Sequence, residues 1–381
     1  MKILFVSMNS IHFQSWANQL KDSGHEVYWF DILDAGKKEA KLYWMNQITN
    51  WKLKLNFPFR YFIKKSLPKL YTFIKRYNEN DTVSVFEKKL LEIQPDVVHS
   101  FALQISCIPI LSVMQKHSNF KWIYSSWGSD MYYSKEIGIS KSDLEACLKR
   151  INFLITDCKR DYKIAQQKGF NNTFLGDFPG NGGIIFNEND IKYNIEERDV
   201  ILIKGYNDAI GKGINIVKAF TENLITLLND YEIIIFGADK EVENYIKSSI
   251  VFAKLNYKLY TKTKFIPNEE LILIMGKSYV YIGNSYSDGI PNALLEAMGM
   301  GAFPIQSSPG GATSEVVEHS KNGLLISNPD DINEIEGLIH SALTNKKMVN
   351  EALVINTKII KDKYERGIMR SKILKIYEGI N

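Results

Sequence analysis

Short runs of consecutive apolar residues recur along the chain, separated by polar or amphipathic stretches of helical period. In the first half the runs cover residues 1–8, 25–32, 96–101, 121–127 and 152–158. In the second half they cover residues 199–205, 231–237, 279–285, 302–307 and 323–327. Apolar strands alternating with helices are typical of parallel sheets covered on both faces. The pattern therefore predicts an α/β protein with two doubly wound, Rossmann-like domains.

The boundary between these domains is expected in a Gly-rich and then polar stretch, residues 178–199. We predict an N-terminal domain over 1–185 and a C-terminal domain over 186–362. A last helix, 363–381, is expected to cross back to the first domain after a break near Gly367. In open parallel sheets ligands bind at the carboxyl ends of the strands, so two such domains predict a cleft between them.

Composition narrows the class of protein. The 381 residues suit two domains, and 45% hydrophobic with 24% charged residues is typical of a globular enzyme. Three scattered cysteines give neither a disulfide framework nor metal-ligand spacing, so no metal is expected. The opening "MKILFVSM" is interpreted as a strand and not a secretion signal, and no run approaches the roughly 18–20 apolar residues of a membrane span. A cytoplasmic location is expected.

Charge is distributed unevenly. Residues 37–76 hold eleven Lys or Arg, one acid and nine aromatic residues, while the whole chain has a net charge of +4. Pro58 and Pro68 exclude one long helix in this segment. Cationic, aromatic and amphipathic stretches bind anionic bilayer surfaces, so 37–76 is predicted to dock on a membrane. A solvated face with its own core contacts is the alternative, and nucleic acid is disfavoured because no recognition motif accompanies the segment.

Two acids flank a turn in "SYSDGIPNALLEAMGMG", residues 285–301. Asp288 lies in the loop after an apolar strand, and Glu296 lies inside the helix that follows, with Pro291 expected in its first turn. Free N–H groups at such a helix start favour an anionic or heavily hydroxylated ligand. The alternatives are a helix N-cap for Asp288 and an exposed helical glutamate for Glu296. A second glycine turn, Gly310–Gly311, follows the next strand and would complete a phosphate cradle.

The strand and loop at 201–213 nearly form a P-loop. Five residues separate Gly205 from Gly211, and Lys212 is followed by glycine where a magnesium-binding hydroxyl is needed, so an NTPase is excluded. No G-x-G-x-x-G follows the first strand, which disfavours a dinucleotide dehydrogenase. Lys204 and Lys212 are predicted to pair with a diphosphate as point charges; solvated lysines are the alternative.

The stretch "SDGIPNALLEAMGMGAFPIQSSPGG", followed by "SE" and "NGLLI", resembles the retaining glycosyltransferases of family four, also called glycosyl transferases group 1. The resemblance implies the GT-B fold. The first acid of the family motif, a glutamate that holds the donor sugar, falls on Asp288. The second, which grips the nucleotide ribose, falls on Glu296. An arginine expected after Gly205 is replaced by Tyr206.

The resemblance implies further residues of the donor site. Asp288, Lys212 and His12 are predicted to take part in catalysis, and Glu296 to bind the donor. The remaining donor-binding residues are predicted to be Lys204, Gly205, Gly289, Ile290, Pro291, Asn292, Ala293 and Leu295. Retaining transfer in this fold is thought to need no protein nucleophile, since the positive cradle stabilises the leaving diphosphate. No cofactor is implied, because the nucleotide sugar is a substrate.

The first half departs more from the family. His12 follows the first strand and could orient an acceptor hydroxyl. Trp127 stands where many members have histidine; it could stack on a sugar, and Asp130 could bind a hydroxyl. Ser129 and His99 complete the predicted acceptor-binding set. For each of the two histidines, Trp127 and Asp130, a structural role is the alternative.

We therefore predict a retaining glycosyltransferase that moves a sugar from a nucleotide diphosphate, UDP favoured and GDP second, to an oligosaccharide or lipid-linked acceptor. Such a role suits bacterial surface polysaccharide synthesis, lipopolysaccharide or capsule, at the inner face of the cytoplasmic membrane. The alternatives are a GT-B nucleotide-sugar epimerase or hydrolase, and a non-catalytic subunit that binds glycan or membrane.

Overall fold

The computed structural model describes residues 1–34, 36–185 and 187–380, and the chain forms two compact units. Unit 1 holds Met1–Asp157, Asp161–Gly182 and Lys372–Asn381, and unit 2 holds Cys158–Arg160 and Gly183–Ser371. The chain therefore passes from unit 1 to unit 2 more than once, and its last helix contributes to both.

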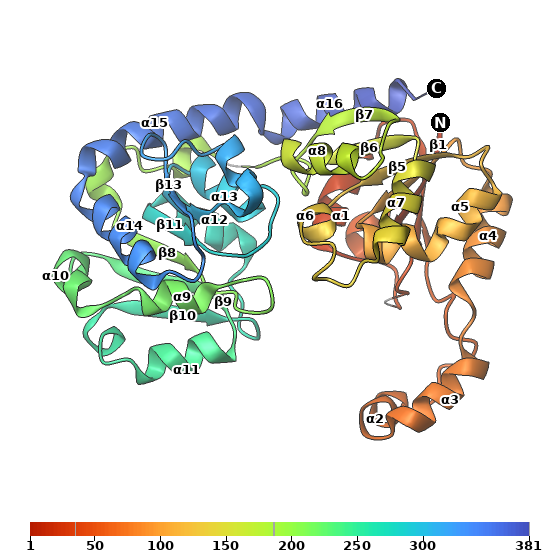
Figure 1. Ribbon diagram of the computed structural model, residues 1–381, viewed down its shortest axis with the longest axis horizontal. Coiled ribbons are helices and arrows are strands. Elements are labelled where there is room, and N and C mark those ends of the chain that lie inside the picture. Colours follow the sequence, from red (N-terminus) through yellow and green to blue (C-terminus); the bar gives the residue numbers. More distant parts are fainter. Residues whose placement is uncertain (35, 186, 381) are drawn as a thin grey trace. The chain divides into compact units, whose positions relative to one another are not determined.

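Unit 1 is built on a parallel sheet with the strand order β3-β2-β1-β4-β5-β6-β7 (Figure 1). Its strands are β1 Lys2–Ser7, β2 Glu26–Asp31, β3 Asn46–Ile48, β4 Val97–Phe101, β5 Lys121–Ser125, β6 Phe153–Thr156 and β7 Thr173–Asp177. Its helices are α1 Ile11–Ala17, α2 Arg60–Ser66, α3 Pro68–Asn78, α4 Thr82–Ile93, α5 Leu111–Lys116, α6 Ser129–Tyr132, α7 Lys141–Arg150 and α8 Lys159–Gln167, whose first residues belong to unit 2.

Unit 2 repeats this plan with the strand order β10-β9-β8-β11-β12-β13. Its strands are β8 Val200–Lys204, β9 Glu232–Ala238, β10 Tyr257–Thr261, β11 Ser278–Gly283, β12 Phe303–Ser307 and β13 Leu324–Ile326. Its helices are α9 Gly213–Lys218, α10 Ile225–Leu228, α11 Lys240–Ser248, α12 Asn268–Gly276, α13 Asn292–Gly299, α14 Ile332–Thr344, α15 Lys346–Lys363 and α16 Arg366–Glu378, which continues into unit 1.

All strand pairs in both sheets are parallel, and successive residues of the central strands enter different cores. Ile201 and Ile203 of β8 belong to one cluster of buried residues and Leu202 to another. This alternation is what a sheet covered on both faces requires. The prediction of two doubly wound domains is confirmed.

Every strand predicted from an apolar run is present, but three further strands were missed. These are β3, β7 and β10, and each lies at the edge of its sheet. β7 and β10 contain no fully buried residue. A half-covered edge strand lacks the continuous apolar run that marks a central strand.

The break between the last two helices lies at Tyr364 and Glu365, earlier than the predicted Gly367. The Glu365 carboxylate accepts hydrogen bonds from the backbone N–H groups of Gly367 (2.7 Å) and Ile368 (3.1 Å). An acid at this position satisfies the free donors of the helix start, so α16 begins before the glycine.

Candidate functional site

The site in unit 2 forms at the carboxyl ends of β8, β11 and β12. Lys204 is the last residue of β8, and Asp288 lies in the loop after β11. The Lys204 amine lies 4.0 Å from the Asp288 carboxylate, and each side chain keeps about a third of its surface exposed, 28% and 32%. An accessible acid and cation thus stand side by side where open parallel sheets bind ligands.

Asp288 is not the N-cap of α13. Pro291 occupies that position with an extended backbone, and one Asp288 oxygen accepts a hydrogen bond from the N–H of Gly289 at 3.0 Å. The N-cap alternative for Asp288 is therefore wrong, and so is the placement of Pro291 inside the first turn. The carboxylate is available to a ligand.

Glu296 lies on α13 and is partly buried. Burial raises the pKa of its carboxyl to about 7, although the positive charges of Arg366 and Lys204 act in the opposite direction. The exposed-glutamate alternative is therefore wrong. A carboxyl whose charge is poorly solvated, and on which two cations act, is suited to accept hydrogen bonds from a ligand.

Arg366, the first residue of α16, is a member of the site that sequence reasoning missed. It donates a hydrogen bond from Nη2 to the carbonyl of Gly183 at 2.9 Å, and burial lowers its pKa while Glu296 raises it. Tyr206 replaces the arginine expected after Gly205, and Arg366 brings a guanidinium to Glu296 from the far end of the sequence. The family motif did not point to Arg366, because this residue lies outside it, 70 residues beyond Glu296.

Arg160 was also missed. Its guanidinium is buried and donates from Nη1 to the carbonyls of Asp288 (2.9 Å) and Pro309 (2.6 Å). One side chain thereby ties the loop after β11 to the loop after β12. The Glu315 carboxylate accepts the backbone N–H groups of Lys159 and Arg160, both at 2.8 Å, and so fixes the segment that carries this arginine.

Two neutral polar side chains form the floor beside these acids. Tyr281 is paired with Leu202 and Pro304, and Gly283 with Gln306, so Tyr281, Gln306 and Lys204 point to the same face of the sheet. Among the described residues, the Tyr281 hydroxyl and Gln306 Oε1 are buried without a hydrogen-bond partner. Burial and then the carboxylates of Asp288 and Glu296 raise the Tyr281 pKa.

Gly283 is what leaves room for this floor. A Cβ atom at that position would lie 2.1 Å from Gln306 Oε1 and 3.0 Å from the Tyr281 hydroxyl. Buried polar atoms without partners are rare in folded proteins. Two of them beside a pair of acids indicate that a ligand or water completes the site.

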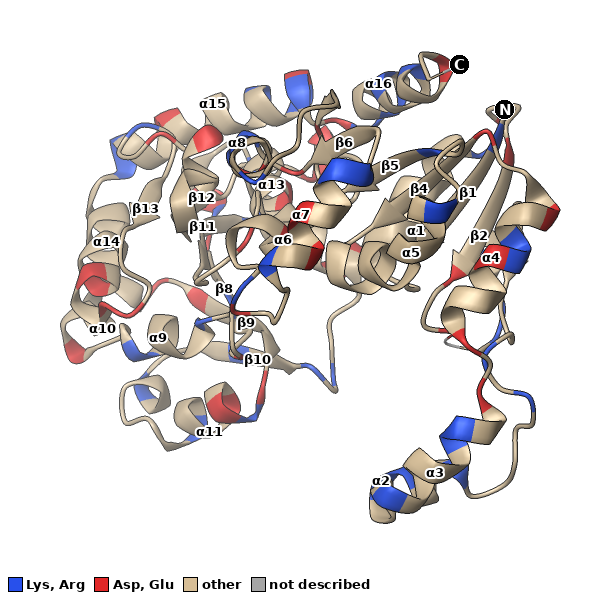
Figure 2. Cartoon of the chain, turned by 45° about the vertical axis from the view of Figure 1, so that its right-hand side comes forward, with Lys and Arg blue, Asp and Glu red and all other residues tan. Residues whose placement is uncertain are grey.

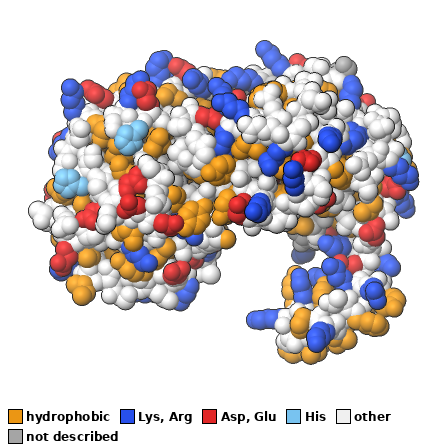
Figure 3. All heavy atoms as spheres, in the orientation of Figure 1, with side chains coloured by type: hydrophobic (Ala, Val, Ile, Leu, Met, Phe, Trp, Pro, Cys, Tyr) orange, Lys and Arg blue, Asp and Glu red, His pale blue; other side chains and the backbone are white. Residues whose placement is uncertain are grey.

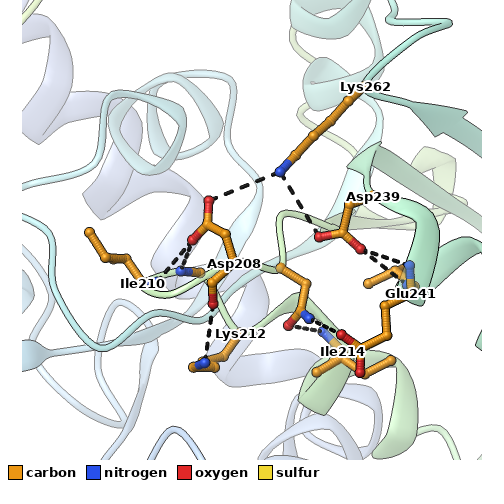
Figure 4. A network of polar contacts seen from close by, with 10 residues as sticks. Asp208, Ile210, Lys212, Ile214, Asp239, Glu241 and Lys262 are labelled. Carbon is orange, nitrogen blue, oxygen red and sulfur yellow. Dashed lines mark hydrogen bonds and ion pairs between the residues drawn. The ribbon is translucent and has the colours of Figure 1, made fainter. Parts of the chain in front are cut away.

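The loop after β8 is held rigid by the contacts shown in Figure 4. Asp208 accepts the backbone N–H groups of Ile210 (2.9 Å) and Gly211 (2.8 Å), and Lys262 bridges Asp208 and Asp239 at 4.0 and 3.9 Å. The Lys212 amine donates to the Asp208 carbonyl at 3.2 Å and lies 4.3 Å above the ring of Tyr286. Lys204 is thus the lysine beside Asp288, while the diphosphate role of Lys212 stays a prediction.

The other predicted donor-binding positions lie in the loop after β8, in the loop after β11 and in α13. Gly205 packs so closely that a Cβ would lie 2.8 Å from Ile235, and Ile290 is buried under its loop. Leu295 is buried in the core, while Asn292 and Ala293 begin α13 with partial exposure. The N–H of Gly289 donates a hydrogen bond to the Asp288 carboxylate. Their contacts with a donor stay predictions.

In unit 1, two predicted acceptor residues are neighbours. The ring of His12, at the start of α1, lies 6.0 Å from the ring of Trp127, which follows β5. His12 is exposed and Trp127 partly exposed, and Trp127 also packs on Phe101 at 5.6 Å. An imidazole beside an indole at the carboxyl ends of β1 and β5 suits a hydroxyl-bearing ligand.

Asp130 is buried and organises its surroundings. One carboxylate oxygen accepts hydrogen bonds from Leu103 N–H (2.9 Å), the Tyr124 hydroxyl (2.8 Å) and Trp127 N–H (3.1 Å). Burial raises the Asp130 pKa to about 6. These contacts favour the structural alternative, in which Asp130 positions Trp127; Ser129, beside it, is partly exposed.

His99 lies inside unit 1 with no exposed surface. Nδ1 is 2.7 Å from the Tyr377 hydroxyl, and Nε2 is 2.8 Å from Ser125 Oγ. Burial lowers its pKa to about 3, so the ring is neutral at ordinary pH. A direct contact between His99 and an acceptor finds no support in this geometry, which favours the structural alternative.

The fold and site define an α/β protein with two doubly wound sheets, one of which carries paired acids and cations around a glycine-rich loop. Residues 186–358 match the family model described as glycosyl transferases group 1. Over these residues the resemblance inferred from the sequence is confirmed. No curated protein matches the chain by sequence.

Solved structures of the GT-B fold resemble the whole chain. Sucrose-phosphate synthase from Thermosynechococcus elongatus is 14% identical with a TM-score of 0.71, covering 100% of this chain and 99% of that one. HepE from Anabaena, solved in complex with UDP and glucose, is 15% identical with a TM-score of 0.66 and full coverage of both chains. TarM is 12% identical with a TM-score of 0.69, covering 100% of this chain and 98% of that one. At these identities the likeness shows the fold, and the GT-B prediction is confirmed.

Proposed function

We propose that this protein is a retaining glycosyltransferase that uses a nucleotide-diphosphate sugar, with a UDP-sugar as the first choice of donor. The observation that carries the proposal is the convergence of Asp288, Glu296, Lys204 and Arg366 beside the glycine-rich loops of unit 2. Carboxylates accept hydrogen bonds from sugar and ribose hydroxyls, and the cations match a diphosphate. The HepE structure in complex with UDP and glucose supports UDP as the first nucleotide to test.

In the proposed reaction the bond between sugar C1 and the diphosphate oxygen breaks, and a bond from C1 to an acceptor hydroxyl oxygen forms on the same face. The acceptor proton passes to the leaving diphosphate. Lys204 and Arg366 stabilise the negative charge that develops on that group, so the proposed reaction needs no metal ion. Asp288 orients the sugar, Glu296 holds the ribose, and His12 with Trp127 positions the acceptor.

We further propose that the acceptor is a glycan or lipid-linked saccharide of a bacterial surface polysaccharide, and that transfer takes place at the cytoplasmic membrane surface. The basic and aromatic composition of residues 37–76 supports this location. No helix in the described part of the chain is long and apolar enough to span a bilayer.

The first experiment measures binding of UDP, GDP and dTDP and their sugars by thermal shift and calorimetry. We expect UDP to stabilise the protein and Glu296→Ala to weaken UDP binding at least tenfold, because a charge-assisted hydrogen bond is lost. If no nucleotide binds, the donor-site proposal fails and the non-catalytic alternative gains support. Undiminished UDP affinity in Glu296→Ala would refute the ribose assignment alone.

Turnover is then measured with oligosaccharide and lipid-linked acceptors, with and without EDTA. Retention predicts an unchanged anomeric configuration in the product by NMR, and the proposed reaction predicts equal rates in EDTA. Donor consumption at the same rate without any acceptor would instead support the epimerase or hydrolase alternative.

A further inference from the structure

Two short helices of unit 1 form a hairpin that contributes nothing to the core. α2 and α3 follow one another with a single residue between them, and neither contains a buried residue. A two-stranded stalk carries them: Lys54 N–H donates to the Asn78 carbonyl (2.9 Å), and Asn80 N–H donates to the Lys52 carbonyl (2.7 Å). Figure 1 shows this hairpin and its stalk in orange.

The hairpin is only part of the basic segment 37–76. The part before it packs against the sheet and core of unit 1, because β3 pairs with β2 and because Leu42, Met45 and Trp51 are buried. The indole of Trp51 also donates to the Asp31 carbonyl at 2.8 Å. A surface that binds a partner must therefore be sought in residues 52–78.

Large apolar side chains of the hairpin face solvent. On α3, Leu70, Phe73 and Tyr77 are spaced three and four residues apart, so they share one helix face, and they are 46%, 60% and 65% exposed. Tyr61 and Phe62 of α2 are 77% and 64% exposed. Exposed apolar residues gathered on one element, rather than scattered singly, mark an interaction surface.

The charge of the hairpin has a single sign. Residues 59–78 contain six cations, Arg60, Lys64, Lys65, Lys69, Lys75 and Arg76, and no acid. Figure 2 shows them as blue bands on α2 and α3, and Figure 3 shows blue and orange side chains intermixed over the hairpin. Lys69 and Arg76 each precede a residue of the apolar face and therefore border it.

We infer that the α2–α3 hairpin docks on an anionic lipid bilayer, with the Leu70, Phe73 and Tyr77 face in the outer acyl region and the bordering cations at the phosphates. Short cationic helices with aromatic residues bind bilayers in this way. A second copy of the hairpin is disfavoured as the occupant because two surfaces of the same charge repel. A nucleic acid would pair with the cations but leave the aliphatic and aromatic face in water. The inference deepens the membrane location proposed above by naming the docking element, and vesicle binding tests it separately from the transferase reaction.

The test is co-sedimentation of the full-length protein with vesicles of phosphatidylcholine alone or mixed with phosphatidylglycerol. We expect binding to the anionic vesicles that weakens as salt is raised. Replacing Leu70, Phe73 and Tyr77 together by serine should weaken binding on the order of 100-fold, because each partly inserted side chain contributes up to about tenfold. Lys69→Gln with Arg76→Gln should weaken it about 25-fold on anionic vesicles, at about fivefold per cation.

A matched control carries Ile250→Ser and Phe265→Ser, two side chains of unit 2 that are 73% and 76% exposed. It should bind vesicles like the unchanged protein, and circular dichroism and UDP binding should be the same in all variants. Equal binding to neutral and anionic vesicles, or full binding by the triple serine variant, would overturn the inference. So would the absence of vesicle binding together with a hairpin-dependent dimer in ultracentrifugation or hairpin-dependent binding to single-stranded DNA.

Discussion

Glu296→Gln tests whether the buried Glu296 carboxylate lowers the stability of the folded protein at neutral pH. Burial raises the pKa of this carboxyl from an ordinary 4.5 to about 7, and the charges of Arg366 and Lys204 only partly offset the burial. A raised pKa means that the folded state binds the proton more tightly than the unfolded state. The stability contributed by the protonated carboxyl is therefore complete below pH 4.5 and is lost as the pH rises to about 7.

The size of the effect follows from the two pKa values. The interval from 4.5 to about 7, at 1.36 kcal/mol per pH unit, corresponds to about 3 kcal/mol of unfolding free energy. Glutamine has no charge to bury, so the variant lacks this loss. Removal of the carboxylate leaves Arg366 with less compensation, but that offset changes little with pH because guanidinium stays charged. The stability of Glu296→Gln relative to the unchanged protein should therefore rise by about 3 kcal/mol between pH 4.5 and pH 8.

The assay is urea unfolding at several pH values, followed by circular dichroism. Tryptophan fluorescence supplies an internal control, because all six tryptophans, at positions 16, 29, 44, 51, 122 and 127, lie in unit 1. The unit 1 transition should be the same in both proteins, and the difference should appear in the remaining transition. A stability difference that does not change with pH would refute the reasoning.

The same carboxyl should make nucleotide binding depend on pH. If Glu296 binds ribose hydroxyls as a carboxylate, UDP affinity of the unchanged protein should fall tenfold per pH unit below about 7. In Glu296→Gln it should be weaker at pH 8 and independent of pH. A stabilising substitution that impairs binding would identify Glu296 as a functional residue and not a structural one.

Three further outcomes are expected. Arg160→Ala should weaken UDP-sugar binding at least tenfold, because the Asp288 and Pro309 carbonyls lose their common donor. The control is Lys159→Ala, which keeps the backbone contact with Glu315. Equal UDP-sugar affinities of the two variants would contradict the role of Arg160 in holding the two loops. Tyr281→Phe should leave stability within about 1 kcal/mol, because its hydroxyl has no partner among the described residues; it should lower donor affinity about threefold to tenfold, and an unchanged affinity would place the hydroxyl outside the site. Arg198→Met should cost about 3 kcal/mol or more, because the buried guanidinium donates to the carbonyls of Lys192 (2.7 Å), Ser278 (2.6 Å) and Met300 (2.8 Å); a shift of the urea midpoint at constant slope measures it, and no shift would refute it.

The amino-acid sequence alone determined the central strands of both sheets. A strand covered on both faces must be apolar along its buried length, and the runs "VILI" and "YVYI" meet that requirement. The break between α2 and α3 at Pro68 follows from local backbone chemistry and is equally visible in the sequence. Asp288 and Glu296 were found in the same way, because their motif lies within one loop and one helix.

The tertiary structure decided what comes to those acids from elsewhere in the chain. Arg160 reaches the loops after β11 and β12 from 128 residues before Asp288, and the charge of Arg366 acts on Glu296 from 70 residues beyond it. No local pattern encodes such a meeting, since it depends on how strands and helices far apart in sequence are packed. Burial likewise depends on packing: it gives Glu296 its raised pKa, removes His99 from solvent, and leaves the α2–α3 hairpin uncovered while the neighbouring Trp51 enters the core. The sequence predicted the two acids of the candidate site, and the fold decided their neighbours, because solvation and long-range contact are properties of the packed chain.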